Sequence, residues 1–509
     1  MEAHLADLLE WGNVPPADRF AVRHRAPFTT VTMSSRPDGY PPMRPGGLFV
    51  AIRGHARDGH EFVRDAFANG ASAAIVDHVP DDLSQAIRDG TISIITLPGG
   101  GTPHPIDDWP GGAPLPPGKP VLVRVNPEIG TMAALQRFGS WWRDRWARPV
   151  VAIAGSVGKT STKDLVVSVL SRRFRTLGTA GNLNNELGLP ITLLGLESAH
   201  EVAAVEIGIS APGEMATFAG LASPDCAVMT RIEAEHMEFL HDLETVAREE
   251  GTLVEFLRPG GTAVLNLDDP VVAAMGNRTR ARVATYGEAP GAATRAEGVR
   301  AIGLDGIAFR LVHDGRQADV HLPLAGRHFV AAALAAAATG FALGCDWPEV
   351  IAGLEAPPTS PRVRVARVHD RLVIIDDTYN ASPASCLAAL DLLAGCDGTR
   401  VAVLGDMFEL GEHEAPAHAQ VGAYVAGRAH ALVAVGNASR GIARAAIDAG
   451  MDREAVSWVA RAADAPGALE TWRHASGTSG RLTVLVKGSR GMRMEDAVRA
   501  LDVPVKPMP

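Results

Sequence analysis

A glycine-rich segment with one lysine and two hydroxyl side chains is the strongest chemical signal in this 509-residue chain. After an apolar run it reads Gly155-Ser156-Val157-Gly158-Lys159-Thr160-Ser161. Glycines let backbone N–H groups turn toward phosphate oxygens, a lysine reaches the terminal phosphates, and a threonine hydroxyl binds Mg²⁺. The segment therefore predicts a phosphate-binding loop. Its two glycines are separated by two residues rather than the usual four, which leaves a plain strand–turn–helix as the alternative.

Two further side chains are suited to hold a metal ion beside that loop. Glu206 ends the apolar run 202–205, and a carboxylate at a buried strand end is costly unless it is paired or bound to a metal. His236 follows a second apolar run, 226–230. Ligands at neighbouring strand ends favour a Mg²⁺ site. A salt-bridged glutamate and an ordinary loop histidine are the alternatives.

Alternating strand and helix patterns must position these residues. Apolar runs predict strands at 48–52, 71–76, 121–125, 150–155, 204–210, 226–230, 372–377, 400–406, 431–436 and 481–488. Helical spacing is present at 62–69 and 162–170. Such alternation indicates doubly wound parallel sheets with ligands at the carboxyl ends of the strands. We expect an α/β fold of three domains: a small N-terminal domain (1–146), a central P-loop parallel-sheet domain (147–356) and a C-terminal Rossmann-like domain (357–509).

Length and composition fit this organisation. A chain of 509 residues suits about three domains, and 46% hydrophobic with 21% charged residues is typical of a globular protein. A net charge of −10 argues against a broad nucleic-acid surface. The four cysteines form no CxxC pair, so we expect a reducing compartment. The N-terminus lacks a signal-peptide layout, and the alanine-rich run 329–345 reads as an internal helix rather than a membrane span. These features predict a cytoplasmic protein.

Several motifs stand in one order along the chain. They are GGLFVAIRGHARDGHEF (46–62), GSVGKTS (155–161), GNLNNELGLP (181–190), EIG (206–208), EAEHMEF (233–239), DDTYNASPAS (376–385), LGDMFELG (404–411) and VKGSRGMRME (486–495). In this order and spacing they resemble the Mur ligase family of ATP-dependent amide-forming enzymes. The resemblance covers all three expected domains.

The resemblance implies a reaction. Such ligases transfer the γ-phosphate of ATP to a substrate carboxylate, and an amine then attacks the acyl phosphate to give an amide, ADP and phosphate. The motifs imply ATP and two Mg²⁺ ions as cofactors. They imply UDP-N-acetylmuramoyl-tripeptide and D-alanyl-D-alanine as partners, in peptidoglycan precursor synthesis, and a monomeric protein. No nucleic acid and no membrane is expected as a partner.

The resemblance also assigns roles around the nucleotide. It implies ATP-binding residues at Gly155, Ser156, Val157, Gly158, Lys159, Thr160, Ser161, Arg362, Asp377 and Tyr379. It implies Mg²⁺ ligands at Thr160, Glu206 and His236. It implies catalytic roles for Lys159, Glu206, His236 and Asn380. Because Arg362, Asp377, Tyr379 and Asn380 come from the third domain, domain closure is expected in the cycle.

Substrate-binding roles follow in the same way. The family's uridine-nucleotide site falls at Ser35 and Arg36, and Asn184 and Asn185 are expected near the phosphates and substrate. Lys487 and Arg490 suit the carboxylate of an incoming dipeptide, with a solvent-facing pair as the alternative. Asp406 and Glu409 are candidates to orient its ammonium group, with loop and helix capping as the alternative.

The chain departs from the family pattern at two places. Members often have a carbamylated lysine that bridges two Mg²⁺ ions, and Glu250 stands at its position. We hypothesise that Glu250 supplies the same charge without CO₂; an exposed helical glutamate is the alternative. Phe329 and Ala332 replace two asparagines expected near the adenine, so Phe329 is a candidate to stack on the base.

Other functions are compatible with parts of this pattern. A Mur-like ligase for a different acid and amine would keep the ATP machinery and change the outer domains. A non-catalytic nucleotide-binding relative would bind ATP without turnover. A simple NTPase or kinase would hydrolyse or transfer phosphate without needing both an acid and an amine.

Overall fold

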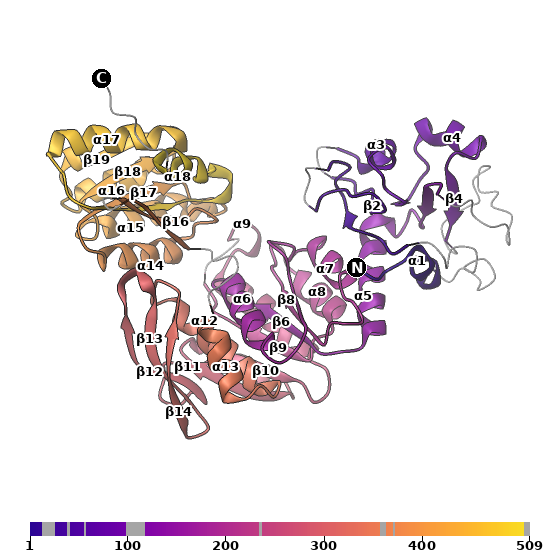
Figure 1. The fold of residues 1–509 in the computed structure, drawn as a ribbon, viewed down its shortest axis with the longest axis horizontal. Coiled ribbons are helices and arrows are strands. Elements are labelled where there is room, and N and C mark those ends of the chain that lie inside the picture. Colours follow the sequence, from indigo (N-terminus) through magenta and orange to yellow (C-terminus); the bar gives the residue numbers. More distant parts are fainter. Residues whose placement is uncertain are drawn as a thin grey trace.

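Three β-sheets, each built from a different part of the chain, organise the molecule. The computed structural model describes residues 1–12, 26–37, 41–54, 57–97, 118–233, 237–356, 363–369 and 372–502. In this part of the chain the sheets have five, nine and six strands. Figure 1 shows them, with their helices, as three bodies in a bent row, the central body lying between the other two.

The N-terminal sheet is parallel throughout. Its strand order is β1-β2-β3-β5-β4, with β1 (Val31–Thr32), β2 (Leu48–Val50), β3 (Ala73–Val76), β4 (Ser93–Thr96) and β5 (Val121–Arg124). The helices of this part are α1 (Leu5–Trp11), η1 (Gly59–Phe62), α3 (Val63–Ala68), η2 (Asp81–Leu83) and α4 (Ser84–Arg88). Its strands are continuous apolar runs because both faces of a parallel sheet are covered. The strands predicted at 48–52, 71–76 and 121–125 are confirmed within two residues at each end.

Helix α5 (Gly130–Trp146) joins the first body to the second. It packs against α7 (Gly188–Leu194) of the central body, and its Leu135 and Phe138 belong to a core shared with both sheets. Its Arg143 is fully buried, and Nε donates to the carbonyl oxygen of Ala222 at 2.8 Å. The helix thus falls within the predicted N-terminal domain yet is anchored on the central one. The domain boundaries at 146/147 and 356/357 stay predictions.

The central sheet combines parallel and antiparallel strands. Its order is β14-β13-β12-β11-β10-β9-β6-β8-β7, with β6 (Val150–Ala154), β7 (Thr176–Gly178), β8 (Val202–Glu206), β9 (Cys226–Met229), β10 (Thr262–Asn266), β11 (Arg282–Gly287), β12 (Thr294–Ala301), β13 (Ile307–His313) and β14 (Arg316–Leu322). The strands from β7 to β12 run parallel, whereas β12, β13 and β14 are antiparallel neighbours. The expectation of parallel alternation throughout is therefore corrected at this edge. The two residues between β13 and β14, Asp314 and Gly315, both have positive φ, which is the geometry of a tight hairpin.

Helices cover both faces of the central sheet. They are α6 (Lys159–Leu170), α7, α8 (Glu214–Ala222), α9 (Met237–Leu240), α10 (Leu243–Gly251), η3 (Thr252–Phe256), α11 (Pro270–Ala274), η4 (Met275–Arg278), η5 (Gly303–Asp305), α12 (Phe329–Ala342) and α13 (Trp347–Leu354). The alanine-rich helix α12 is almost entirely buried against α6, which confirms the internal helix predicted there. None of the described helices has the length and apolar character needed to cross a bilayer.

The C-terminal sheet is parallel except at one edge. Its order is β15-β16-β20-β17-β18-β19, with β15 (Arg364–His369), β16 (Leu372–Asp377), β17 (Thr399–Gly405), β18 (Ala431–Val435), β19 (Val456–Val459) and β20 (Leu482–Lys487), and β15 is antiparallel to β16. Its helices are α14 (Pro383–Ala394), η6 (Gly411–His413), α15 (Glu414–Val425), α16 (Arg440–Asp448), η7 (Arg453–Ala455), η8 (Ala462–Asp464), α17 (Ala465–Ser476), η9 (Arg490–Met492) and α18 (Glu495–Asp502). The four strands predicted for this unit are confirmed within one residue at each end.

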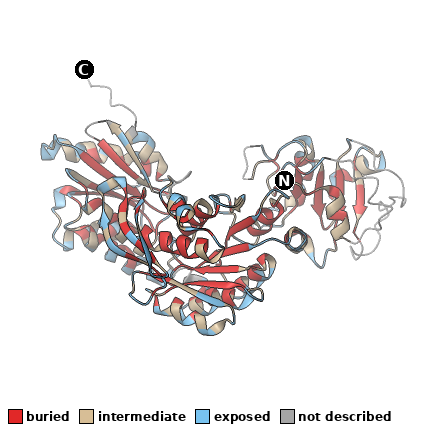
Figure 2. Cartoon of the chain, turned by 60° about the horizontal axis from the view of Figure 1, so that its bottom comes forward, coloured by how far each residue is buried: buried red, intermediate tan, exposed pale blue. Residues whose placement is uncertain are grey.

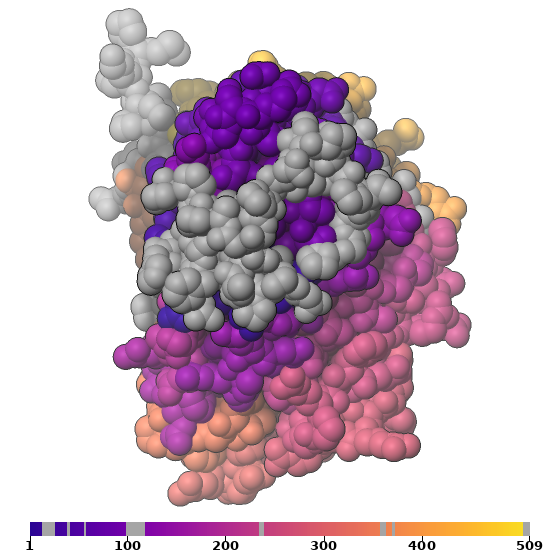
Figure 3. Space-filling view, turned by 90° about the vertical axis from the view of Figure 1, so that its right-hand side faces the viewer, coloured from indigo at the N-terminus to yellow at the C-terminus, as the bar shows by residue number. Residues whose placement is uncertain are grey.

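Burial follows this layered architecture. Figure 2 shows buried residues concentrated on the strands and on the helix faces turned toward them. Viewed from its N-terminal end, the molecule presents the surface of the N-terminal body above that of the central body, with parts of the C-terminal body behind (Figure 3). The central and C-terminal bodies also touch directly, because Arg367 Nη2 of β15 lies 2.7 Å from Asp305 Oδ1 of η5. The sheets thus bring the carboxyl ends of β6, β8, β9, β16 and β20 toward one region.

Candidate active site

The predicted phosphate-binding loop connects β6 to α6. Gly155 and Gly158 have φ of +117° and +90°, in the region that favours glycine. A Cβ on Gly155 would collide with the Thr230 hydroxyl, so the loop lies too close to the end of β9 for any side chain there. Gly158 is the N-cap of α6 and directs the first turn of that helix toward the cavity. The sequence thus folds locally as a phosphate loop requires.

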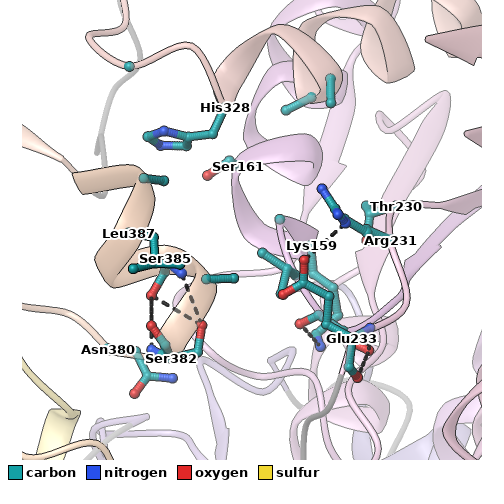
Figure 4. A pocket seen from close by; sticks show the side chains of 18 of the residues that line it. Lys159, Ser161, Thr230, Arg231, Glu233, His328, Asn380, Ser382, Ser385 and Leu387 are labelled. Atoms are coloured by element: carbon teal, nitrogen blue, oxygen red, sulfur yellow. Dashed lines mark hydrogen bonds and ion pairs between the residues drawn. The ribbon is translucent and has the colours of Figure 1, made fainter. Parts of the chain in front are cut away.

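One large cavity lies at this loop. Its volume is about 2060 Å³, and it is lined by both the central and the C-terminal body. Figure 4 shows Lys159, Arg231 and Glu233 on one wall and Asn380, Ser382, Ser385 and Leu387 on the other, with His328 above. Among the predicted site residues, the cavity is lined by Ser156, Val157, Gly158, Lys159, Thr160, Ser161, Asn184, Glu206, Asp377, Tyr379, Asn380, Glu409, Lys487 and Arg490. Residues from two bodies therefore meet at one site.

Glu206 is the last residue of β8 and is almost fully buried. Its Oε2 accepts a hydrogen bond from the Thr160 hydroxyl at 2.7 Å, and its Oε1 accepts one from Asn184 Nδ2 at 2.8 Å. Two ligand oxygens at right angles around Mg²⁺ stand about 3.0 Å apart, since each lies about 2.1 Å from the ion. The Thr160 and Glu206 oxygens therefore already have the separation and the chemistry of neighbouring Mg²⁺ ligands.

Glu250 lies on the buried face of α10, one turn after Val246. It is 2% exposed, which excludes the alternative of an exposed helical glutamate. Its Oε2 accepts a hydrogen bond from the Gly155 backbone N–H at 2.8 Å, so its carboxylate supports the phosphate loop directly. It is not among the residues lining the cavity. A role as a Mg²⁺ ligand stays a prediction.

A buried ion pair joins two strand ends in the C-terminal sheet. Lys487 Nζ, at the end of β20, lies 2.6 Å from Asp377 Oδ2, at the end of β16, and also donates to the Asn380 carbonyl oxygen at 3.0 Å. The solvent-facing alternative for Lys487 is therefore wrong, because its side chain is 3% exposed. Arg490 lies over the Tyr379 ring, 5.6 Å from its centroid. These contacts shape the 377–380 loop that lines the cavity.

The two acidic residues after β17 have different surroundings. Asp406 accepts hydrogen bonds from the backbone N–H groups of Asn437, at 3.0 Å, and Ser439, at 2.7 Å. This is the capping arrangement that the sequence left open, and Asp406 is not among the residues lining the cavity. Glu409 does line the cavity and has a φ of +64°. Glu409 is therefore the better placed of the two for an ammonium group.

Several predicted site residues do not line the cavity. Asn185 lies just before α7, where its Oδ1 accepts a hydrogen bond from the Gly188 N–H at 3.0 Å, and it does not line the cavity. Ser35 and Arg36 lie in the N-terminal body, outside the cavity lining. Gly155 does not line the cavity, and it packs closely against Thr230 and Arg231. His236 and Arg362 lie outside the described residues, so their roles stay predictions.

The start of α12 forms another part of the cavity wall. His328, Phe329 and Ala332 line it, and the Phe329 ring is packed into the core with its centroid 4.2 Å from that of His328. His328 is exposed to the cavity, whereas Phe329 is 3% exposed. The ring that this wall presents to the cavity is that of His328, whereas the burial of Phe329 argues against the predicted stacking of its ring on a base.

Arg231 and Glu233 were missed by the sequence reasoning. Both line the cavity, and Arg231 Nε lies 2.9 Å from Glu233 Oε1. Arg231 stands two residues after β9, the strand that pairs with β6 in front of the phosphate loop. Its position directly after the predicted strand 226–230 was the available signal.

Comparisons with known proteins agree with this geometry. A family model described as Mur ligase middle domain matches residues 153–340, one described as Mur ligase, glutamate ligase domain matches 362–490, and one described as Mur ligase family, catalytic domain matches 42–96. The UDP-N-acetylmuramoyl-tripeptide--D-alanyl-D-alanine ligase of Escherichia coli (strain K12) is 32% identical over 468 residues, covering 90% of this chain and 91% of that protein. The protein of the same name from Bacillus subtilis (strain 168) is 30% identical, covering 89% and 90%.

Solved structures show the same fold. A crystal structure of MurF from Acinetobacter baumannii superposes with a TM-score of 0.78 at 27% identity, covering 99% of both chains. The MurF ligase from Thermotoga maritima, solved in complex with ADP, superposes with a TM-score of 0.73 at 22% identity, covering 93% of this chain and 97% of that one. The three bodies described here thus recur together in these structures.

Proposed function

This chain belongs to the Mur ligase family, and on that basis we propose that it joins D-alanyl-D-alanine to UDP-N-acetylmuramoyl-tripeptide with conversion of ATP to ADP and phosphate. The product is a peptidoglycan precursor. The observation that supports it most is the cavity where the phosphate loop and the Thr160–Glu206 pair face the 377–380 loop of another body. A ligase needs such a site because nucleotide and acceptor must meet away from water.

The first step is phosphoryl transfer. A carboxylate oxygen of the tripeptide attacks the γ-phosphorus of ATP, and the bond from that phosphorus to the β–γ bridging oxygen breaks with its electrons going to ADP. The phosphate-loop N–H groups and Lys159 hold the phosphates in line with the attacking oxygen. Thr160 and Glu206 would hold a Mg²⁺ ion, which would supply positive charge beside the phosphate oxygens.

The second step forms the amide. The amine of D-alanyl-D-alanine attacks the acyl carbon, the C–O bond to phosphate breaks with its electrons going to phosphate, and the departing phosphate takes up the proton that the nitrogen loses. Asn380 and Glu409 line the cavity from the C-terminal side, where they can contact the incoming dipeptide. Arg490 is the cation we assign to its carboxylate, because Lys487 already neutralises Asp377.

The proposed function also includes a second metal ion, a UDP site and a cellular location. A second Mg²⁺ would be held by His236, with Glu250 supplying charge behind the phosphate loop in place of a carbamylated lysine. The UDP group would bind at the N-terminal body near Ser35 and Arg36. The protein would act as a monomer in the cytoplasm.

Phosphate release tests this function. The enzyme is incubated with ATP, Mg²⁺, UDP-N-acetylmuramoyl-tripeptide and D-alanyl-D-alanine, and each component is also omitted in turn. We expect release only with both substrates, and a product heavier than the tripeptide by the dipeptide less water. Release without the amine would favour an NTPase. Tight ATP binding with no release would favour a ligase for another acid and amine.

A further inference from the structure

The backbone of Arg231 is fixed on the phosphate loop. Arg231 stands two residues after β9, whose Met229 pairs with Ala154 at the end of β6. Its carbonyl oxygen accepts a hydrogen bond from the Ser156 N–H at 2.7 Å. A Cβ on Gly155 would lie only 3.1 Å from the Arg231 nitrogen, so the two loops are in close contact. The backbone of Arg231 is therefore fixed relative to the phosphate loop.

The side chain of Arg231 enters the cavity. It is 63% exposed there, and its Nε lies 2.9 Å from Glu233 Oε1. Glu233 is tied to the same loop, because the Ser156 hydroxyl and the Glu233 backbone exchange two hydrogen bonds of 3.0 Å. Figure 4 shows both side chains beside Lys159. The pair therefore holds a guanidinium at the phosphate site.

Ser156 links this guanidinium to the lysine of the phosphate loop. Its carbonyl oxygen accepts from Lys159 Nζ at 3.2 Å, while its N–H and hydroxyl bind the 231–233 segment. Lys159 and Arg231 are thus both held by contacts to Ser156 of the phosphate loop. Stability does not explain why Arg231 is here, because an exposed ion pair such as Arg231–Glu233 contributes at most about 1 kcal/mol to the free energy of unfolding.

We propose that Arg231 is a catalytic residue that binds the transferred γ-phosphoryl group of ATP, and that Glu233 positions its guanidinium. This proposal rests on the proposed function. As the carboxylate oxygen bonds to the γ-phosphorus and the bond to the β–γ bridging oxygen breaks, charge spreads over the three γ-oxygens. The planar guanidinium fork donates two hydrogen bonds to those oxygens. It does not contact the phosphates that remain in ADP.

The test distinguishes binding of the transferred γ-phosphoryl group, measured by kcat, from binding of ADP, measured by its affinity. Arg231→Gln is compared with Arg231→Lys, and with Arg444→Gln, which removes an exposed arginine on α16 away from the cavity. We expect Arg231→Gln to lower kcat about 100-fold or more with ADP affinity changed less than about threefold, and Arg231→Lys to recover part of the loss. Arg444→Gln should match the wild type. A kcat for Arg231→Gln within about threefold of wild type would overturn the proposal.

Glu233→Gln distinguishes catalysis from a structural ion pair. This variant keeps the cation, so we expect it to retain most of the kcat that Arg231→Gln loses. Equal losses of kcat in both variants, or a loss of ADP affinity in Arg231→Gln as large as its loss of kcat, would contradict the proposal.

If the wild type shows no ligase turnover, the proposed function fails, and Arg231 is tested by binding of ADP with aluminium fluoride. Arg231→Gln should weaken that binding at least about tenfold, and unchanged binding would overturn the inference.

Discussion

The hydroxyl of Thr160 donates a 2.7 Å hydrogen bond to the carboxylate of Glu206, which joins the first turn of α6 to the end of β8. Both side chains are almost fully buried. Carboxylate and hydroxyl oxygens are ligands that Mg²⁺ prefers in proteins. The pair supplies two of the oxygen ligands that the proposed Mg²⁺ site requires.

Glu206→Gln is expected to weaken Mg²⁺ binding. The amide keeps the shape of the side chain but loses the charge, so the Mg²⁺ concentration for half-maximal activity should rise at least about tenfold, with a lower kcat. The measurement is phosphate release against Mg²⁺ concentration. Glu297→Gln, at an exposed position on β12, is the control. Equal Mg²⁺ dependence in both variants would exclude Glu206 as a ligand.

Glu250 is expected to make carbamylation unnecessary. Activity of the wild type should be unchanged when CO₂ and bicarbonate are removed, because the carboxylate at this position is part of the side chain. Glu250→Gln keeps an acceptor for the Gly155 N–H and loses the charge, so it should raise the Mg²⁺ requirement severalfold. Unchanged Mg²⁺ dependence in that variant would contradict a role of Glu250 in Mg²⁺ binding and would leave it only its hydrogen bond to the phosphate loop.

Glu250→Ala tests that support separately. It removes the acceptor of a buried backbone N–H and should lower the free energy of unfolding by about 1–3 kcal/mol. Hydrogen exchange of the β6–α6 segment measures the loss locally. If the segment exchanges as slowly as in the wild type, the hydrogen bond does not stabilise the loop.

Lys487→Met is expected to destabilise the C-terminal sheet. The substitution leaves the Asp377 carboxylate buried without its cation, which costs about 3–5 kcal/mol. Adding Asp377→Asn should recover part of the loss, since the double variant has no buried charge at this place. Urea unfolding followed by hydrogen exchange at β20 measures both. A single variant as stable as the wild type, with a raised KM for D-alanyl-D-alanine, would instead indicate a direct contact with the dipeptide.

The N-terminal body is expected to lose stability in mild acid through His60. This side chain is 3% exposed, its Nδ1 lies 2.6 Å from Asp58 Oδ1, and its Nε2 accepts from the Asp77 N–H at 3.2 Å. Burial lowers the pKa of His60 in the folded state. Below about pH 6.5 the unfolded chain therefore binds a proton that the folded chain resists, and stability falls as the pH falls.

The matched variants are His60→Gln and, at an exposed position on β14, His321→Gln. Hydrogen exchange of β3 between pH 5 and 7.5 should show a weaker pH dependence in His60→Gln than in the wild type. His321→Gln should leave it unchanged. An identical pH dependence in all three proteins would exclude His60 as the cause.

Local pattern predicted most elements and the phosphate loop because those depend on neighbours in sequence. The run 372–377 and the structure agree at both ends of β16, and α6 begins where the glycines end. The β13–β14 hairpin was not predicted although Asp314-Gly315 is a common hairpin turn, because the strand–helix alternation before it predicts a parallel sheet. The burial of Glu250 could also be inferred, since it stands four residues after Val246 on one helix face.

Contacts between distant strands were beyond such reasoning. Lys487 and Asp377 are 110 positions apart, and their pairing depends on β16 and β20 being neighbours. The capping of the 437–439 segment by Asp406 depends in the same way on β17 and β18. Strand order within a parallel sheet is set by packing of the whole unit, so it has no signal in any one segment.

The transfer of oxygen from substrate to phosphate tests the central claim most directly. UDP-N-acetylmuramoyl-tripeptide labelled with ¹⁸O in its reacting carboxylate is turned over with ATP and D-alanyl-D-alanine, and the released phosphate is analysed by mass spectrometry. We predict one ¹⁸O atom in each phosphate, because the attacking oxygen stays on phosphorus when the amine displaces it. Unlabelled phosphate, released while substrates are consumed, would contradict an acyl-phosphate ligase.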